Sequence, residues 1–136
     1  MKKLTREWVK KAETDYHVAT QMMQTVPPEP DAVCFHSQQL AEKYLKGLLQ
    51  ELGTTPPRTH ELIRLYTLLP PQYASLRSLR RGLLFLTRHA VDSRYPGEHP
   101  TKREAQAALR WAERVRTAAR ALLRIRPSKP PRKKTP

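Results

Sequence analysis

Two residues suited to phosphodiester chemistry, Arg94 and His99, stand near the joint between two long Pro-free stretches, with four residues between them. An arginine offers a permanent cation for a phosphate, and a histidine gains and loses a proton near neutral pH. These are the two groups that cleavage of a phosphodiester without a metal requires. A plainer alternative exists, because a basic chain contains this spacing by chance. In that alternative His99 is merely exposed. Arg94 then caps a helix or pairs with Glu42 or Asp15.

The surroundings of this pair favour a phosphate site. Pro96-Gly97 breaks the preceding helix, and Thr101 with Glu104 has the pattern of a capping box at the start of the next one. The free backbone amides of that helix start lie just beyond the pair and could receive a phosphate oxygen. Arg88 and Tyr95 complete the RNA-binding side chains that we predict around the pair.

A second polar set, Gln38, Glu42 and His60, is a candidate nucleotide-binding site. Gln38 and Glu42 fall on the shoulder of the apolar stripe of one predicted helix, whereas Lys46 falls on its far polar face. A carboxylate beside so much apolar surface needs a partner. We expect Glu42 to hold Arg94 in place, with His60 completing the pocket. The alternative for His60 is a local hydrogen-bonding role at a helix start.

No metal or cofactor site is expected from the sequence. The five histidines are scattered, without a His-x-x-x-His pair, and there is no Gly-rich phosphate loop or nucleophile elbow. The single cysteine, Cys34, lies on an apolar helical line and is predicted to be a small core residue. One cysteine excludes an internal disulfide and is typical of a reducing cytosol. The five scattered histidines mentioned above are His17, His36, His60, His89 and His99.

These residues must be positioned by helices. The chain has 13 Pro and only 4 Gly, with the prolines gathered at the joints of long Pro-free runs, and no segment alternates as a strand does. The pattern predicts an all-α, single-domain antiparallel bundle of about five helices, four long and one short, over residues 1–123. The predicted helices span about 5–26, 31–52, 59–69, 72–93 and 102–126.

Polar and turn residues mark several features of these helices. Asp15 interrupts the apolar stripe of the first helix, so it either pairs with a Lys or Arg of a neighbouring helix or forms a second carboxylate near Glu42. Val26 is the last residue of that stripe. Asp31 is predicted to cap the second helix, and Gly53 to end it.

The charge of the chain indicates an anionic partner. Lys and Arg number 26 against 12 Asp and Glu, which gives a net charge of +14. This favours RNA or another nucleic acid over a membrane surface, although a merely solubilising Arg-rich surface is the alternative. Residues 124–136 form a basic Pro-rich tail that we predict to be disordered. With no apolar run of membrane-spanning length and no secretory signal, we expect a cytoplasmic protein.

Four blocks of the sequence resemble the HEPN domain family, and the resemblance covers roughly residues 4–123. The blocks are residues 8–19, Phe35-His36-Ser37-Gln38-Gln39 followed by Glu42-Lys43-Tyr44-Leu45-Lys46, Arg58-Thr59-His60-Glu61-Leu62, and Ser93-Arg94-Tyr95-Pro96-Gly97.

The resemblance implies a bundle of about five helices that forms a homodimer. It also implies a metal-independent endoribonuclease whose Arg-x(4–6)-His motif corresponds to Arg94 and His99. Such proteins often act as the toxin of a toxin–antitoxin pair, with a minimal nucleotidyltransferase as partner. One position departs from the pattern, because Tyr95 follows Arg94 where ribonuclease members tend to have a small polar residue. A catalytically inactive nucleotide-binding or nucleotidyltransferase-partner module therefore stays open.

Overall fold

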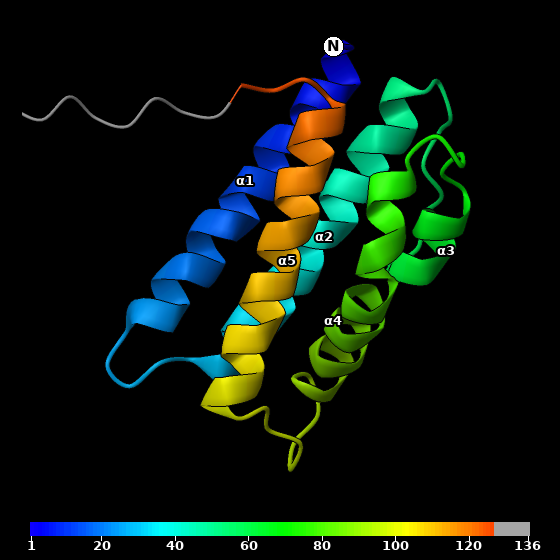
Figure 1. Ribbon diagram of the computed structural model, residues 1–136. Helices are drawn as coiled ribbons and strands as arrows, with labels where there is room; N and C mark the ends of the chain where they lie inside the picture. Colours follow the sequence, from blue (N-terminus) through cyan, green and yellow to red (C-terminus); the bar gives the residue numbers. More distant parts are fainter. Residues whose placement is uncertain (127–136) are drawn as a thin grey trace, which may run out of the picture.

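The structure is a computed structural model and describes residues 1–126. Within that range all regular secondary structure is helical, in agreement with the predicted all-α bundle (Figure 1). The predicted disorder of the basic tail falls, from residue 127 onward, outside the described residues. No helix in the described range is long and apolar enough to cross a membrane. The segments are α1 (Lys3–Gln24), α2 (Pro30–Glu51), α3 (Leu62–Thr67), the 3₁₀ helix η1 (Ala74–Leu79), α4 (Arg80–Asp92) and α5 (Lys102–Leu122).

Helix α2 lies at the centre of the bundle and contacts α1, α3, α4 and α5 (Figure 1). The predicted apolar line of this helix is confirmed from Cys34 to Leu48, where its residues are at most 1% exposed, but its last predicted member, Leu52, is the C-cap residue and is 40% exposed. They pack with leucines of α3, η1 and α4 and with the alanine-rich face of α5 in one continuous core. The buried members of the line are Cys34, Ala41, Leu45 and Leu48, with Tyr44 and Leu49 beside them.

Two predicted details at the joint between α1 and α2 are wrong. The first helix ends at Gln24, and Val26 is 98% exposed rather than part of the apolar stripe. A residue that precedes a proline is disfavoured in helical conformation, and Pro27 follows Val26 directly. The N-cap position of α2 is Glu29, so Asp31 lies inside its first turn. There its carboxylate interacts favourably with the positive end of the helix dipole.

The region predicted as one fourth helix divides into η1 and α4 at residue 80. Leu76 and Leu79 of η1 are both buried and stand three residues apart, which matches the three residues per turn of a 3₁₀ helix. From Leu83 onward the buried positions continue with Leu86 and Ala90, at the spacing of an α-helix. The change of period in the apolar residues thus coincides with the change of helix type.

The start of α5 follows the predicted capping box. The Thr101 Oγ accepts a hydrogen bond from the Glu104 backbone N–H at 3.0 Å, and the Glu104 carboxylate accepts one from the Thr101 N–H at 2.9 Å. Two of the helix's free amide groups are therefore satisfied by side chains. This cap sets where the 93–100 loop meets the bundle.

A polar clasp around Glu13 joins α1, α2 and α5. The Glu13 carboxylate accepts hydrogen bonds from the Tyr44 hydroxyl at 2.6 Å and from two nitrogens of Arg116 at 2.7 and 2.8 Å. Arg120 approaches the same carboxylate at 3.4 Å. Burial alone would raise the pKa of Glu13, but the bonds from Arg116 and Tyr44 and the two arginine charges outweigh it and lower the pKa. Burial and the same contact raise the pKa of Tyr44 to about 12.

Candidate functional site

Arg94 lies on the surface just after the end of α4. The helix ends at Asp92, and the Arg94 backbone N–H donates to the Val91 carbonyl at 3.1 Å in a tight turn. Gly97 follows with a φ of 86°, a conformation that glycine adopts without strain. The Arg94 guanidinium rests on the ring of Phe35, with 5.0 Å between its Cζ and the ring centroid. This cation–π contact positions the arginine while leaving its N–H donors exposed.

His99 reaches the same end of α2. Its Nδ1 lies 3.7 Å from the Asp31 carboxylate, close enough for an ion pair when the imidazole is protonated, and its side chain is 70% exposed. Asp31 and Phe35 stand four residues apart on α2 and are therefore neighbours on one face, with Cβ atoms about 5–6 Å apart. Arg94 on Phe35 and His99 on Asp31 are thus brought together at one exposed edge of the bundle.

The prediction that Glu42 holds Arg94 is wrong. Among residues 1–126, no carboxylate lies within ion-pair distance of Arg94, so pairing with Asp15 is excluded as well. Arg94 rests on Phe35, and Glu42 lies seven residues further along α2, about 10 Å along the helix axis. The Glu42 carboxylate is therefore too far along the helix to pair with the arginine. The Arg94 backbone, moreover, has already left the helix.

A small cavity of about 190 Å³ adjoins this edge between the end of α4 and the start of α5. The predicted RNA-binding residue Arg88 and the predicted proton carrier His99 both line it. The buried His89 lines it too, with its Nε2 3.5 Å from the Glu104 carboxylate and its ring 4.2 Å from that of Phe85. Sequence reasoning missed His89. Its four-residue spacing from Phe85 was the available signal, because that spacing places two rings on one helical face.

Tyr95, the remaining predicted RNA contact, points into solvent beside Arg94, and it is 61% exposed. In that position its ring is free to stack on a nucleic acid base.

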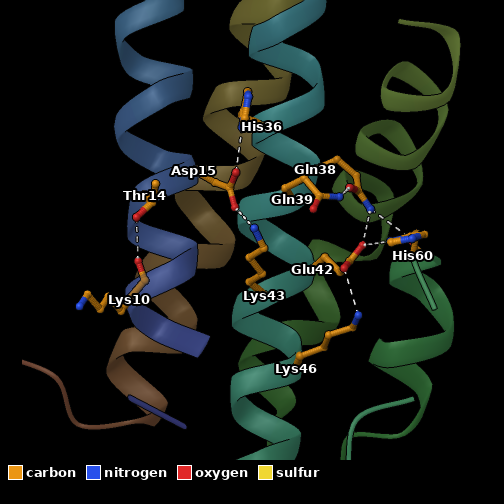
Figure 2. Close-up of polar contacts among 10 residues, drawn as sticks. All are labelled: Lys10, Thr14, Asp15, His36, Gln38, Gln39, Glu42, Lys43, Lys46 and His60. Carbon is orange, nitrogen blue, oxygen red and sulfur yellow. Dashed lines mark hydrogen bonds and ion pairs between the residues drawn. The ribbon is translucent and has the colours of Figure 1, made fainter. Parts of the chain in front are cut away.

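The set of Gln38, Glu42 and His60 forms a buried network on the α3 side of α2 (Figure 2). Glu42 is 3% exposed and lies 2.9 Å from the His60 Nδ1 and 3.1 Å from the Lys46 Nζ. Gln38 is 2% exposed and donates to the His60 carbonyl at 2.9 Å. Only the His60 side chain, 72% exposed, faces solvent. The network joins the 53–61 segment to α2 and leaves little polar surface for a ligand.

The predicted position of Lys46 is wrong. We predicted it on the far polar face of the helix, yet only 8% of its side chain is exposed. The cause is the four-residue spacing from Glu42, which lets the lysine fold back along the helix to its carboxylate. Its ammonium also lies 5.5 Å from the centre of the Trp8 ring, so the aliphatic stem is covered by α1.

Asp15 forms a separate cluster on the α1 side of α2, across the helix from Glu42 (Figure 2). Its carboxylate pairs with Lys43 at 2.5 Å and with the His36 Nδ1 at 2.8 Å. The predicted ion pair with a neighbouring helix is confirmed. His36 was not predicted, because its role depends on how α1 and α2 pack.

Metal-ligating residues do not gather anywhere in the described part of the chain, where no three His, Cys, Asp or Glu side chains could hold an ion. Cys34 is 1% exposed, and burial raises the pKa of its thiol to about 12, so it is a core residue as predicted.

The helical fold is that of a known class of protein. Residues 5–122 match the family described as HEPN domain, and the chain therefore belongs to the HEPN domain family. The resemblance inferred from the four sequence blocks is thus confirmed.

Two solved structures are similar to the chain over nearly its whole described length. The crystal structure of TT1696 from Thermus thermophilus has a TM-score of 0.77 at 26% identity, covering 86% of this chain and 96% of that one. ST0689, an archaeal HEPN homologue, has a TM-score of 0.70 at 30% identity, covering 90% and 99%. No curated protein matches the sequence significantly.

Proposed function

We propose that this HEPN protein is a metal-independent endoribonuclease and that Arg94 and His99 carry the reaction. One observation supports the proposal above the others. Arg94 rests on Phe35 and His99 faces Asp31 at one exposed edge of α2, and within residues 1–126 the arginine has no carboxylate partner. A guanidinium that is positioned by a ring rather than by an acid remains available for a phosphate.

In the proposed reaction the RNA supplies its own nucleophile. The ribose 2′-oxygen attacks the adjacent phosphorus, a new bond forms between phosphorus and the 2′-oxygen, and the bond to the 5′-oxygen breaks. Arg94 neutralises the charge that develops on the phosphoryl oxygens. His99 takes the 2′-hydroxyl proton on its Nε2, because its Nδ1 faces Asp31, which stabilises the imidazolium that results.

The departing 5′-oxygen needs a proton as well. We propose that the protein acts as a homodimer, so that the Arg–His motif of a second protomer faces the same phosphate and returns that proton. Arg88 and Tyr95 extend the contact along the strand. The products are a 2′,3′-cyclic phosphate and a free 5′-hydroxyl, which balance the bonds and protons of the step.

The test is cleavage of a long RNA by the purified full chain in the presence of EDTA. We expect cyclic-phosphate ends, and the loss of cleavage in Arg94→Ala and His99→Ala. Matched controls are Arg81→Ala and His17→Ala, which remove an exposed arginine and an exposed histidine elsewhere. Cleavage that persists in either site variant at the wild-type rate would refute the assignment.

We further propose that the protein is the toxin-like half of a pair with a minimal nucleotidyltransferase. What supports this is the family membership together with the exposed Arg–His edge, which a partner protein could cover or modify. Expression of the chain alone should slow growth, and co-expression of a nucleotidyltransferase encoded beside it should restore growth. If the two proteins co-purify but RNA is never cleaved, the protein is instead a catalytically inactive partner module.

A further inference from the structure

His36 of α2 carries an oriented imidazole that the proposed reaction does not use. Its Nδ1 lies 2.8 Å from a carboxylate oxygen of Asp15, and the Asp15 side chain is only 7% exposed. The other ring nitrogen, Nε2, is turned away from Asp15 (Figure 2) and has no hydrogen-bond partner among residues 1–126. The His36 side chain is 28% exposed, and this nitrogen reaches solvent. It is therefore open to a ligand.

The same imidazole stands beside the candidate cleavage site. Its ring and the Phe35 ring meet edge to face, with 5.1 Å between their centroids and an angle of 88° between their planes. Phe35 is also the ring on which the Arg94 guanidinium rests, at 5.0 Å. Arg94 and His36 therefore contact one aromatic side chain, and a strand held by the arginine runs within reach of the histidine.

The charges around His36 favour an anion once the imidazole is protonated. The charged groups around it are Asp15 from α1, Lys43 from α2 and Arg94 from the 93–100 loop. Lys43 lies 2.5 Å from the second Asp15 oxygen and balances its charge, so the acid does not repel a phosphate. Because the Nδ1 faces a carboxylate, it carries the first proton. Protonation of the Nε2 then makes His36 a cation with an outward N–H.

We propose that His36 is a further phosphate-binding residue of the cleavage site and that Asp15 orients it. Its protonated Nε2 donates to an oxygen of the phosphate that follows the one bound by Arg94, so two groups hold the strand in register. That the strand is RNA rests on the proposed function. The contact forms when His36 is charged and is lost as the pH rises and the imidazole gives up its proton.

The experiment measures binding of the full chain to a single-stranded RNA whose 2′-oxygens are methylated. Such a strand lacks the 2′-hydroxyl nucleophile, so binding can be measured whether or not the protein cleaves RNA. At about pH 6, His36→Gln should weaken binding about fivefold, the scale of one hydrogen bond to a charged group. It should also lower the slope of log K against log salt by about 0.7, the share of one phosphate. At about pH 8 both differences should vanish.

Two further variants separate the charge of His36 from its place in the fold. His36→Gln keeps a side-chain donor for Asp15, and circular dichroism checks that the helices are intact. His36→Lys is charged throughout and should keep the steeper salt slope at about pH 8 as well as at about pH 6. His17→Gln, which removes an exposed histidine of α1, is the matched control and should bind as the wild type does.

The outcomes distinguish this contact from the cleavage reaction. The proposal is overturned if His36→Gln keeps the wild-type salt slope at about pH 6, because His36 then only packs between Asp15 and Phe35. It is also overturned if the loss of binding is the same at both pH values. If the expected changes are seen but ordinary RNA is not cleaved, the His36 contact stands and the proposed function fails. If RNA is cleaved and the slope is unchanged in His36→Gln, the reverse holds.

Discussion

The indole ring of Trp111 in α5 lies directly against the backbone of Gly82 in α4. A Cβ built on Gly82 would stand 2.2 Å from the Trp111 Cε3, a separation that no real contact has. Glycine is therefore the one residue that lets α4 and α5 approach at this point without moving the ring. The contact lies in the first turn of α4, the helix that leads into the 93–100 loop.

Gly82→Ala should destabilise the protein by about 1–3 kcal/mol, the usual cost of overpacking a core. Equilibrium urea unfolding measures the loss. The control is the same substitution in a Trp111→Ala background, where the obstacle is gone. There alanine should stabilise the helix by about 1 kcal/mol, because it is the better helix former. If Gly82→Ala lowers the free energy of unfolding equally in both backgrounds, the Trp111 ring is not the cause of the loss.

Glu42→Ala should cost about 3 kcal/mol, because it leaves Lys46 buried without its carboxylate. Thermal and urea unfolding both report the change. The double variant Glu42→Ala with Lys46→Met should be more stable than Glu42→Ala alone, since no charge is then stranded. If Lys46→Met lowers the stability of the Glu42→Ala variant further, the Lys46 charge is not paired with Glu42.

Stability should fall in acid through the Glu13 clasp. Hydrogen bonds from Arg116 and Tyr44 overcome the effect of burial, and the pKa of Glu13 lies below its ordinary value of 4.5 in the folded protein. Its contribution is therefore complete above pH 4.5 and is lost as the pH drops through the folded pKa. Unfolding free energies measured from about pH 7 to about pH 2 should show this slope.

Glu13→Gln is the variant that tests this source of acid sensitivity. It should lose about 1–2 kcal/mol at neutral pH, because the charge-assisted bonds of Arg116 weaken while the site stays partly exposed. Its acid slope should be shallower than that of the wild type. An unchanged slope would assign the acid sensitivity to other groups, such as Glu51 and Glu104, whose pKa values are also lowered by backbone hydrogen bonds.

Cys34 should be inert to thiol reagents in the native protein. It is 1% exposed, and burial raises its pKa to about 12, so almost no thiolate exists at neutral pH. Alkylation by iodoacetamide in mildly alkaline buffer should proceed only through unfolding and should accelerate steeply in urea. Fast labelling without denaturant, at the rate of a free cysteine, would show that the α2 core opens far more readily than its packing implies.

Much of the fold could be predicted from periodicity. The apolar line of α2 from Cys34 to Leu48 and the capping box at Thr101 depend on neighbours within one helix, so sequence spacing is enough to find them. The helix type of η1 and the burial of Lys46 were missed. Both depend on tertiary context, since a lysine is assigned to a polar face unless its carboxylate partner is known to be buried.

The candidate site was predicted in part. Arg94 and His99 are close in sequence and lie in one loop, so their proximity could be predicted. Their actual supports, Phe35 and Asp31, come from α2, more than fifty residues away. Which turn of α2 meets the loop depends on where α4 ends and how it packs, and no local pattern carries that information.

The two polar clusters of α2 also restrict how the length of this chain can change. Gln38, Glu42 and Lys46 face one flank, while His36 and Lys43 face the other, in a register set by turns of about 3.6 residues. One inserted residue would rotate everything beyond it by about 100° and turn one of these flanks into the leucine core. Insertions and deletions should therefore fall outside α2, in the connecting segments 25–29, 52–61, 68–73 and 93–101.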